Sequence, residues 1–398
     1  MKIAIVSEHA SPLAVLSGTE VGAQSVYVDA LSAALARLGH RVKVYTRRDD
    51  RTLRDEVDTP QRYTVVHVSA GPPEHLPEQQ LLQYMGAFAQ FLDADWAVDR
   101  PDVTHAHYWM SGVATQLAAR HLNLPAVQTF HGVVERRHQG LQGVSPPQRP
   151  KLEAMVAKGA TWVAATCTDE VFELARMGRP RSRISVVPYG VDLNLFTPDG
   201  PKAPRTAPHR IVSVGRLVPR MGFDHIIRAL TVIPDTEFVL AGAPDTAEAC
   251  RLRNLAAELG VDDRVRLQGS VARKDMPALL RSADVVACTP WYEPFGLVAL
   301  EAMACGIPVV ASAVGGMLDT VVDDVTGRLV PPNRPAELAN ALSDLLRDEF
   351  LRQSLGAAGR DRARARYSWD RIAADTLRIY DRSLAAGYQR KAATISSG

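Results

Sequence analysis

The sequence has few of the features that mark secreted or nucleic-acid-binding proteins. Its 398 residues include only 4 cysteines, which stand far apart and form no C-x-x-C pair, so neither a disulfide framework nor a zinc site of paired cysteines is indicated. Lysine and arginine exceed aspartate and glutamate by only 46 − 44 = 2 residues, whereas nucleic-acid-binding proteins usually carry a strong basic excess. We therefore expect no nucleic acid among its partners.

Long apolar runs are also missing. The longest uncharged stretch, residues 302–318, is interrupted by Gly306, Pro308 and Gly315-Gly316, which does not fit a membrane-spanning helix. The apolar run Ile3–Val6 turns polar at once and is too short for a secretory signal peptide. We therefore expect no integral membrane segment and a cytoplasmic location, where the cysteines stay reduced.

What the sequence does contain is an ordinary globular composition, with 46% hydrophobic and 23% charged residues. At this length we expect two domains, each of roughly 100–200 residues. Short apolar runs typical of buried parallel strands alternate with segments of helical spacing. The first predicted strands are Lys2–Val6, Arg41–Thr46, Val65–Val68, Val103–Ala106 and Ala126–Phe130, and the helices between them include Ala23–Leu38 and Ser111–His121. This alternation predicts a doubly wound parallel α/β fold.

The same alternation starts again after a proline-rich stretch, residues 199–209, which is typical of a linker. The later predicted strands are Ile211–Val214, Phe238–Ala241, Val265–Gln268, Val285–Cys288 and Pro308–Ala311. A final helix, Trp369–Ala386, has no strand after it. The sequence therefore predicts two α/β domains, residues 1–199 and residues 200–369.

Ligands of open α/β sheets bind beyond the carboxyl ends of the strands, and two loops there carry glycine or arginine. Gly18 and Gly22 follow the first strand and permit an anion to approach a helix N-terminus, although a plain turn would use the same glycines. Arg216 stands just past the strand Ile211–Val214, where its guanidinium could hold phosphate oxygens. Taken alone, such an arginine is more often a surface residue.

The segment Glu293–Glu301 is the most specific pattern in the chain. Gly296 precedes an apolar helix whose N-terminal N–H groups could bind a phosphate. Glu301 is the lone charge in that helix, and a buried charge is costly unless it has a partner. The two glutamates could flank one ligand from loop and helix, and the plainer interpretation is two structural carboxylates that cap N–H groups.

Three histidines lie near predicted strand ends. His131 follows the strand Ala126–Phe130 directly and has the better case for a functional role. His105 and His107 share one face of a strand, and their H-x-H spacing invites a zinc interpretation. No third ligand stands nearby in the sequence, so packing or polar lining explains them better.

These motifs together resemble those of the retaining GT-B glycosyltransferases of family 4. The resemblance covers nearly the whole chain and rests on Gly18–Gly22, His131-Gly132, Pro188–Asp192, Gly215-Arg216, Glu293–Glu301, Gly306–Val310 and Gly315-Gly316. Residues 18–22 and 105–112 are most similar to the actinobacterial branch that includes the mycothiol-pathway GlcNAc transferases. The chain is therefore expected to be a glycosyltransferase.

The resemblance implies an architecture and a separate substrate for each domain. Two Rossmann-like doubly wound domains face each other across a cleft, and the last helix, residues 370–390, packs back on the first domain. The C-terminal domain holds a nucleoside diphosphate sugar, which is a substrate, and the N-terminal domain supplies the acceptor pocket. No metal and no other cofactor is required, because side chains and a helix N-terminus neutralise the diphosphate.

The resemblance also implies roles for residues of the second domain. Arg216 matches the arginine that binds the donor diphosphate, and Glu301 matches the glutamate on the ribose hydroxyls. The loop that holds the donor sugar and phosphate corresponds to Glu293, Phe295, Gly296 and Leu297.

In the first domain, His131 matches the histidine near the transferring carbon. His131 and Glu293 are therefore the candidate catalytic residues. Gly18 matches the loop close to the diphosphate, and the expected acceptor pocket includes Thr19, Glu20, Tyr108 and Trp109.

Two departures from the family pattern bear on activity and substrate. The usual lysine of the donor-diphosphate site is replaced by Met221, and Arg220 stands one residue early. Losing a cation there should weaken donor binding. In the branch that the chain resembles, users of phosphorylated inositol carry a lysine near the position of Glu78 and an asparagine near that of Ser25. Neither is present, so a phosphorylated acceptor is disfavoured.

The sequence thus predicts a retaining transferase that moves a hexose-type sugar from a nucleotide donor, with UDP favoured and GDP or ADP open, to a small hydroxylated acceptor. Two alternatives remain at this point. One is a nucleotide-sugar-binding protein without activity, suggested by Met221, and the other is a GT-B phosphorylase or hydrolase. The sequence does not fix the oligomeric state, and a homodimer is one option.

Overall fold

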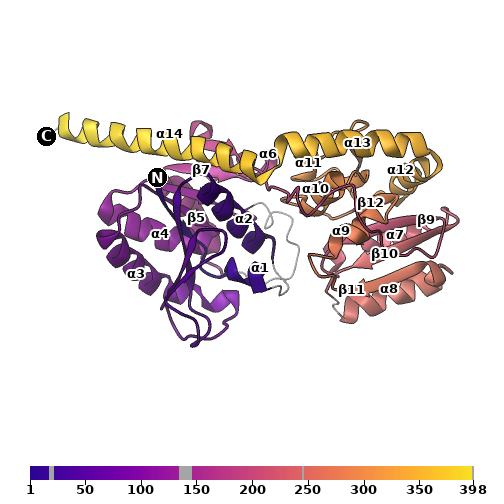
Figure 1. The fold of residues 1–398 in the computed structure, drawn as a ribbon, viewed down its shortest axis with the longest axis horizontal. Coiled ribbons are helices and arrows are strands. Elements are labelled where there is room, and N and C mark those ends of the chain that lie inside the picture. Colours follow the sequence, from indigo (N-terminus) through magenta and orange to yellow (C-terminus); the bar gives the residue numbers. More distant parts are fainter. Residues whose placement is uncertain (18–21, 134–145, 244–245, 397–398) are drawn as a thin grey trace. The chain divides into compact units, whose positions relative to one another are not determined.

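The computed structural model describes residues 1–17, 22–133, 146–243 and 246–396. They form two compact units, one of Met1–Pro188 with Trp369–Gly398 and the other of Tyr189–Ser368 (Figure 1). Each unit has its own largely parallel sheet with helices against it. The predicted pair of doubly wound α/β domains is confirmed.

The sheet of the first unit has the strand order β3-β4-β2-β1-β5-β6-β7-β8 and is parallel except where β3 pairs with β4. Its strands are β1 (Lys2–Val6), β2 (Arg41–Arg47), β3 (Glu56–Asp58), β4 (Thr64–Val68), β5 (Val103–His107), β6 (Ala126–Thr129), β7 (Trp162–Ala165) and β8 (Ile184–Val186). Every residue of β5, β6 and β7 is buried, as expected for parallel strands covered on both faces.

The helices of the first unit are α1 (Leu13–Ser17), α2 (Ala23–Arg37), α3 (Met85–Val98), α4 (Trp109–Leu122), α5 (Arg149–Gly159), α6 (Thr168–Arg176) and α14 (Trp369–Ser396), with the 3₁₀ turns η1 (Glu78–Gln80), η2 (Leu82–Tyr84) and η4 (Arg181–Arg183). The predicted helices at 23–38 and 111–121 correspond to α2 and α4. The strands β3, β7 and β8 are absent from the prediction. β3 (EVD) and β8 (ISV) are three-residue strands with polar residues, whereas β7 (WVAA) is a buried apolar run like those that were predicted.

The last helix, α14, packs within the first unit, where it contacts α2 and the strands β5, β6 and β7 (Figure 1). The ring of Trp369 meets that of Tyr27 edge to face, with centroids 5.4 Å apart. Further along, the Tyr380 hydroxyl hydrogen-bonds Nδ1 of His105 at 2.8 Å. α14 begins 369 − 186 = 183 residues after the end of β8, so the first unit includes a helix from the C-terminal end of the sequence.

The sheet of the second unit is parallel throughout its described strands, in the order β11-β10-β9-β12-β13-β14. Its strands are β9 (His209–Val214), β10 (Thr236–Ala241), β11 (Val265–Gly269), β12 (Val285–Cys288), β13 (Val309–Ser312) and β14 (Gly327–Val330). Its helices are α7 (Phe223–Ala229), α8 (Thr246–Glu258), α9 (Met276–Arg281), α10 (Leu297–Ala304), α11 (Met317–Thr320), α12 (Pro335–Arg347) and α13 (Glu349–Arg366), with the 3₁₀ turns η5 (Pro219–Met221) and η6 (Asp262–Arg264).

The proline-rich stretch 199–209 belongs to the second unit. The buried Arg281 donates from Nε to the carbonyl of Pro201 at 3.0 Å and from Nη1 to that of Thr197 at 3.1 Å. The two chain segments at the ends of this unit also lie side by side, because Val191 N donates to Tyr367 O at 2.7 Å. Proline removes N–H donors, so side-chain hydrogen bonds to the remaining carbonyls hold the stretch in place.

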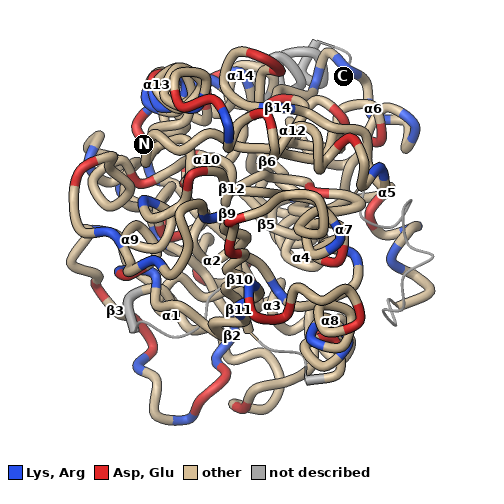
Figure 2. The backbone as a smooth tube through the Cα atoms, turned by 90° about the vertical axis from the view of Figure 1, so that its right-hand side faces the viewer, with Lys and Arg blue, Asp and Glu red and all other residues tan. Residues whose placement is uncertain are grey.

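Each unit has a separate hydrophobic core. The first is built around Trp96, Trp109, Phe88 and Phe130, and the second around Phe238, Ile226, Leu252 and Leu342. Burial of each such side chain contributes about 1.5–3 kcal/mol. Among the helices that the structure describes, none is long and apolar enough to cross a membrane. Basic and acidic residues are interspersed along the chain, in keeping with a net charge of +2 (Figure 2).

Candidate functional site

The first unit gathers polar side chains at the carboxyl ends of three neighbouring strands. β1, β5 and β6 lie next to one another in the sheet. His9 follows β1, Tyr108 follows β5 and His131 follows β6. Since parallel strands end at the same edge, the three side chains come from adjacent loops. The rings of His9 and Tyr108 meet edge to face with centroids 4.9 Å apart.

Two of these residues have unusual backbone conformations. Tyr108 has φ 79° and His131 has φ 55°, a region that non-glycine residues seldom adopt. The Tyr108 turn is held by hydrogen bonds from its own N to Thr129 O at 2.8 Å and from Gln128 Nε2 to its carbonyl at 3.0 Å. Such conformations are kept only where surrounding contacts enforce them, and they gather at functional sites.

His131 is linked to the pair of histidines that end β5. His107 Nδ1 and His131 Nε2 lie 2.8 Å apart, so one ring donates and the other accepts. His105 uses both ring nitrogens, with the Tyr380 hydroxyl at 2.8 Å and with Thr129 Oγ1 at 2.9 Å. The structure therefore brings a third histidine, His131, to the pair His105 and His107, although it stands 24 residues after His107 in the sequence.

The histidine cluster is uncharged. Burial lowers the pKa of His131 and of His107 well below the usual range, and it lowers the pKa of His105 to about 3. Both ring nitrogens of His105 face hydroxyls and His107 Nδ1 faces His131 Nε2, while His107 Nε2 is buried without a hydrogen-bond partner among the described residues. In the described part of the chain no three metal-ligating side chains are grouped to hold an ion. His131 is thus presented as a neutral hydrogen-bonding group.

The predicted acceptor residues lie in different environments. Tyr108 is largely buried, and its hydroxyl donates a hydrogen bond to the exposed Glu78 of η1. Trp109 is fully enclosed in the core behind it. The guanidinium of Arg149 lies over both rings, 5.1 Å from the Tyr108 centroid and 5.8 Å from that of Trp109. Gly18, Thr19 and Glu20 lie outside the described residues.

Three residues that sequence reasoning missed complete this edge. Glu8 is buried, and its carboxylate accepts a hydrogen bond from the Ser111 hydroxyl and pairs with His9 Nδ1 at 2.8 Å. Burial acts to lower the pKa of His9, but the charge and hydrogen bond of Glu8 outweigh it and raise the pKa. The position of Glu8-His9 at the end of the first strand was an available signal. No sequence signal pointed to Arg149, because it begins α5, about 40 residues after Tyr108, and does not follow a strand end.

In the second unit, the predicted donor residues again follow adjacent strands. Arg216 comes after β9 and Glu293–Gly296 after β12, and these two strands are neighbours in the sheet. Gly315-Gly316 of the family pattern follows β13, the next strand. Arg216 is exposed at the strand end. The structure thus brings the predicted donor residues of this unit to one edge.

The loop before α10 is shaped by glycine and by Glu293. Glu293 Oε1 accepts hydrogen bonds from Phe295 N at 3.1 Å and Gly296 N at 3.3 Å. Gly296 has φ 69°, which favours glycine. Gly316 N donates to Glu293 O at 2.8 Å, and a Cβ on Gly316 would come within 2.5 Å of Pro294 O. The expected capping role of Glu293 is thus present, and α10 begins at Leu297, directly after these capped N–H groups.

Glu301 lies one turn into α10, with 5% of its surface exposed. Its Oε1 accepts a hydrogen bond from Arg273 Nη1 at 2.9 Å. Burial raises the pKa of Glu301, and the charge and hydrogen bond of Arg273 counteract this. Arg273 lies between β11 and α9 and was not predicted, because nothing in the sequence marks it as the partner of a glutamate 28 residues later.

Met221 ends η5 close to Arg216. Its methyl group lies against Gly215, where a Cβ on that glycine would come within 2.7 Å, and its side chain packs on the core of the unit. Thr289 Oγ1 donates to the Met221 carbonyl at 3.2 Å. The position where the family pattern has a lysine is therefore beside the end of β9 and is filled by an apolar side chain.

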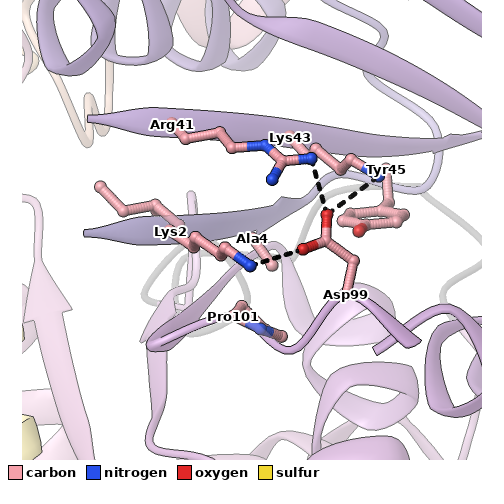
Figure 3. Close-up of a pocket in the computed structure, with 8 residues that line it drawn as sticks. Lys2, Ala4, Arg41, Lys43, Tyr45, Asp99 and Pro101 are labelled. Carbon is pink, nitrogen blue, oxygen red and sulfur yellow. Dashed lines mark hydrogen bonds and ion pairs between the residues drawn. The ribbon is translucent and has the colours of Figure 1, made fainter. Parts of the chain in front are cut away.

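A small pocket lies at the opposite, amino-terminal edge of the first sheet (Figure 3). It is lined by Lys2, Ile3, Ala4, Arg41, Lys43, Tyr45, Asp99 and Pro101. Asp99 pairs with all three cations, at 2.8 Å to Lys2, 2.9 Å to Arg41 and 3.5 Å to Lys43. Lys43 also pairs with Glu56 at 3.4 Å. Since the basic groups are matched by carboxylates, this pocket is a structural ion-pair cluster.

Comparison with known proteins extends over both units. The model of Glycosyltransferase Family 4 matches residues 24–195, and that of Glycosyl transferases group 1 matches residues 200–362. The D-inositol 3-phosphate glycosyltransferase of Xylanimonas cellulosilytica is 38% identical over 95% of this chain and 96% of its own length. That of Mycobacteroides abscessus is 34% identical over 96% of this chain and 90% of its own length.

Solved structures agree. Sucrose-phosphate synthase from Thermosynechococcus elongatus superposes with a TM-score of 0.85 at 30% identity, covering 97% of this chain and all (100%) of the other. Anabaena HepE, solved with UDP, has the same fold, with a TM-score of 0.74 at 21% identity over 96% of this chain and 100% of its own. Because the likeness runs through both Rossmann-like units and reaches identities above 30% over nearly the full length, this chain belongs to the GT-B glycosyltransferases of family 4.

Proposed function

We propose that this glycosyltransferase is a retaining enzyme that moves a hexose-type sugar from a nucleoside diphosphate sugar, with UDP favoured, to a small hydroxylated acceptor. The observation that carries the proposal is the loop and helix 293–304 at the carboxyl end of β12. There a helix N-terminus, suited to phosphate, stands one turn before a buried carboxylate suited to ribose hydroxyls.

The donor would be held by groups of the second unit. The α10 N-terminus and the exposed Arg216 would balance the diphosphate charge, so we propose that no metal is needed. Glu301 would accept hydrogen bonds from the ribose. Anabaena HepE, which shares the fold, is solved with UDP and with UDP-glucose, which supports the choice of a UDP-sugar as the first donor to test.

The chemistry we propose is attack by an acceptor hydroxyl on the same face of the sugar that the diphosphate leaves. The bond from the anomeric carbon to the acceptor oxygen forms as the bond to the phosphate oxygen breaks, and that phosphate oxygen takes the acceptor proton. His131, buried and neutral, would hydrogen-bond the sugar or acceptor near the reacting carbon. A neutral imidazole there adds no positive charge that would oppose the oxocarbenium-like transition state.

For the acceptor, we propose an unphosphorylated polyol such as a cyclitol. The named relatives are D-inositol 3-phosphate glycosyltransferases, so a cyclitol is the natural starting point. In this chain the Tyr108 hydroxyl is bonded to the carboxylate of Glu78, and the nearby Arg149 is paired with Glu153 at 2.7 Å. A phosphate placed there would meet one exposed carboxylate and a cation that is already neutralised.

The tests are a binding panel followed by turnover. UDP-, GDP- and ADP-sugars are compared by thermal shift, since a ligand that binds only the folded state raises its apparent stability. The sugar that shifts the transition most is then offered with myo-inositol and with D-inositol 3-phosphate. We expect transfer to myo-inositol, and the Glu78→Lys variant should move the preference toward the phosphate. Faster transfer to the phosphate by the unmodified protein would contradict the acceptor proposal alone.

The relatives do not favour the two alternatives, an inactive binding protein and a phosphorylase or hydrolase. The same assay separates them from a transferase. An inactive binding protein would show a thermal shift with the nucleotide sugar but no turnover. A phosphorylase or hydrolase would transfer the sugar to phosphate or to water in the absence of a polyol. We also place the enzyme in the cytoplasm, where its 4 free cysteines would remain reduced.

A further inference from the structure

Arg273 forms an ion pair with Glu301 in the second unit. Its Nη1 donates to Glu301 Oε1 at 2.9 Å, and its guanidinium lies over the ring of Phe196, 5.2 Å from the centroid. Phe196 is 1% exposed and fixes that guanidinium from one side. The Arg273 side chain itself is 34% exposed, so it approaches the buried carboxylate from the surface of the unit.

The hydrogen bond leaves half of the carboxylate available. It uses Oε1, and among the residues that the structure describes no donor is bonded to Oε2. A carboxylate has acceptor sites on both oxygens, so one oxygen can be fixed by protein while the other receives a ligand hydroxyl. The α10 N-terminus, four residues earlier at Gly296–Leu297, is the point where we place the diphosphate.

The remaining groups around Glu301 do not replace Arg273. Asp192 is negative and disfavours the charge on Glu301. The thiols Cys288 on β12 and Cys305 after α10 are themselves kept neutral by burial. Arg281 on α9 acts on Cys305. The ionised form of Glu301 in this apolar helix therefore depends on the Arg273 guanidinium.

We propose that Arg273 is a positioning residue for the donor nucleotide: it engages Oε1 of Glu301 and so presents the ionised carboxylate, with Oε2 open, to the ribose hydroxyls. This inference rests on the proposed role of Glu301 in donor binding. The ribose is common to UDP, GDP and ADP, so the inference holds whichever base the donor carries.

Removal of the guanidinium should make nucleotide binding depend on pH. A buried carboxyl without a cation takes up a proton at a higher pH, and a protonated carboxyl is a poorer acceptor for ribose hydroxyls. In an Arg273→Gln variant, affinity should be low near neutral pH and should rise as the pH is raised and Glu301 ionises. In the unmodified protein the Arg273 guanidinium opposes proton uptake by Glu301, so this component should be smaller and lie at lower pH.

The test is titration of the full chain with UDP by calorimetry from about pH 5 to about pH 9, a span that covers known pKa values of buried glutamates. Glu301→Gln, which cannot titrate, reports the pH dependence of UDP itself and is the reference to subtract. We expect Arg273→Gln to bind UDP about tenfold more weakly than the unmodified protein near pH 7 and to recover toward pH 9. Arg273→Lys, which keeps the positive charge, should bind with a pH profile close to that of the unmodified protein.

A second ligand shows whether the effect acts through the ribose. With 2′-deoxyuridine diphosphate, one of the hydroxyls offered to Glu301 is missing, so the difference between the unmodified protein and Arg273→Gln should shrink. If Arg273→Gln lost the same factor at every pH, or the same factor for both nucleotides, Arg273 would be a structural residue and the inference would be overturned. If Arg273→Gln does not fold, an Arg273→Lys pH profile that departs from that of the unmodified protein would overturn it equally.

Failure of the proposed function looks different. In that case the unmodified protein itself would not bind UDP, GDP or ADP at any pH. Binding by the unmodified protein together with an unchanged Arg273→Gln profile would retain the proposed function and remove only the role of Arg273.

Discussion

The two units place their candidate residues at the same kind of position, the carboxyl edge of a parallel sheet, but fill it with different chemistry. In the first unit the edge carries the buried, uncharged rings of His107 and His131, with the ion pair of Glu8 and His9 beside them. In the second it is made of an exposed arginine, a helix N-terminus and a carboxylate paired with a cation. This difference fits the division that we propose, in which the first edge meets a hydroxylated acceptor and the second a diphosphate and its ribose.

Buried glutamates show the same contrast. Glu170 of α6, in the first unit, accepts from Thr166 N at 2.5 Å and from Thr166 Oγ1 at 2.8 Å, with no cation bonded to it among the described residues. Burial raises its pKa to about 6. Glu301, in the second unit, has Arg273. Burial raises the pKa of both carboxyls, and of the two only Glu301 has a paired cation that opposes the rise, as suits the ligand-binding role that we propose for it.

The largest effect that tests this contrast between the two units is expected from replacing His131. We expect His131→Ala to slow turnover by a factor on the order of 10²–10³, the usual loss for one polar contact in a transition state. Binding of UDP should remain nearly unchanged, because the nucleotide is assigned to the second unit. Steady-state kinetics and calorimetric titration of UDP measure the two effects, and equal losses in both would make His131 a structural residue.

The reciprocal change is Glu301→Ala in the second unit. Losing hydrogen bonds to a charged acceptor should weaken donor binding by about 1.5–3 kcal/mol, or roughly 10- to 150-fold. Thermal unfolding of the variant controls for damage to α10. An unchanged dissociation constant for the nucleotide would remove Glu301 from the ribose site and with it the contrast between the units.

A stability measurement sharpens the contrast between the glutamates. Glu170 has a folded-state pKa of about 6 against an ordinary value of 4.5, so the folded state binds its proton more tightly. Its contribution to stability is therefore present below pH 4.5 and is lost as the pH rises to about 6, by about 2 kcal/mol.

The measurement is thermal unfolding of the unmodified protein and of Glu170→Gln across that range. Glutamine cannot ionise, so the variant should gain on the unmodified protein as the pH rises from about 4.5 to about 6. Parallel curves for the two proteins would show that Glu170 does not titrate in this window.

A smaller effect is expected from restoring the lysine of the family pattern. Met221 lies beside Gly215, next to Arg216, and lysine has a stem of similar length that can carry its ammonium outward. We expect Met221→Lys to tighten nucleoside diphosphate binding by about 1 kcal/mol after the cost of ordering the side chain, and less in high salt.

Arg220→Ala is the matched comparison. If Arg220→Ala abolished binding while Met221→Lys changed nothing, Arg220 would fill the role of the missing lysine from one residue earlier. If neither variant differed from the unmodified protein, the diphosphate would be held by Arg216 and the α10 N-terminus.

The smallest expected effect is that of a chelator. Since a guanidinium and a helix N-terminus can balance the diphosphate, turnover should be unchanged by EDTA. Loss of activity on chelation, restored by magnesium or manganese, would mean that the second unit needs a cation it does not itself provide.

The sequence was most informative where a pattern is local. Buried strands such as Lys2–Val6 and Val285–Cys288 form continuous apolar runs, and Gly296 before the apolar stretch 297–304 marks a helix start after a loop, so these elements were predictable. The three-residue strand β8 was not, because so short a run gains its strand conformation from its neighbour in the sheet.

The candidate site residues also fall into those that the sequence predicts and those that only the structure reveals. The residues that follow strand ends, His131, Arg216 and Glu293 among them, could be named from the order of strands and loops, because parallel strands deliver their next residues to one edge. Arg273 beside Glu301 and Arg149 over Tyr108 are contacts between segments far apart in the chain. Only the tertiary structure decided these partners and the neutrality of the histidine cluster, since both depend on which groups are buried together and left without water.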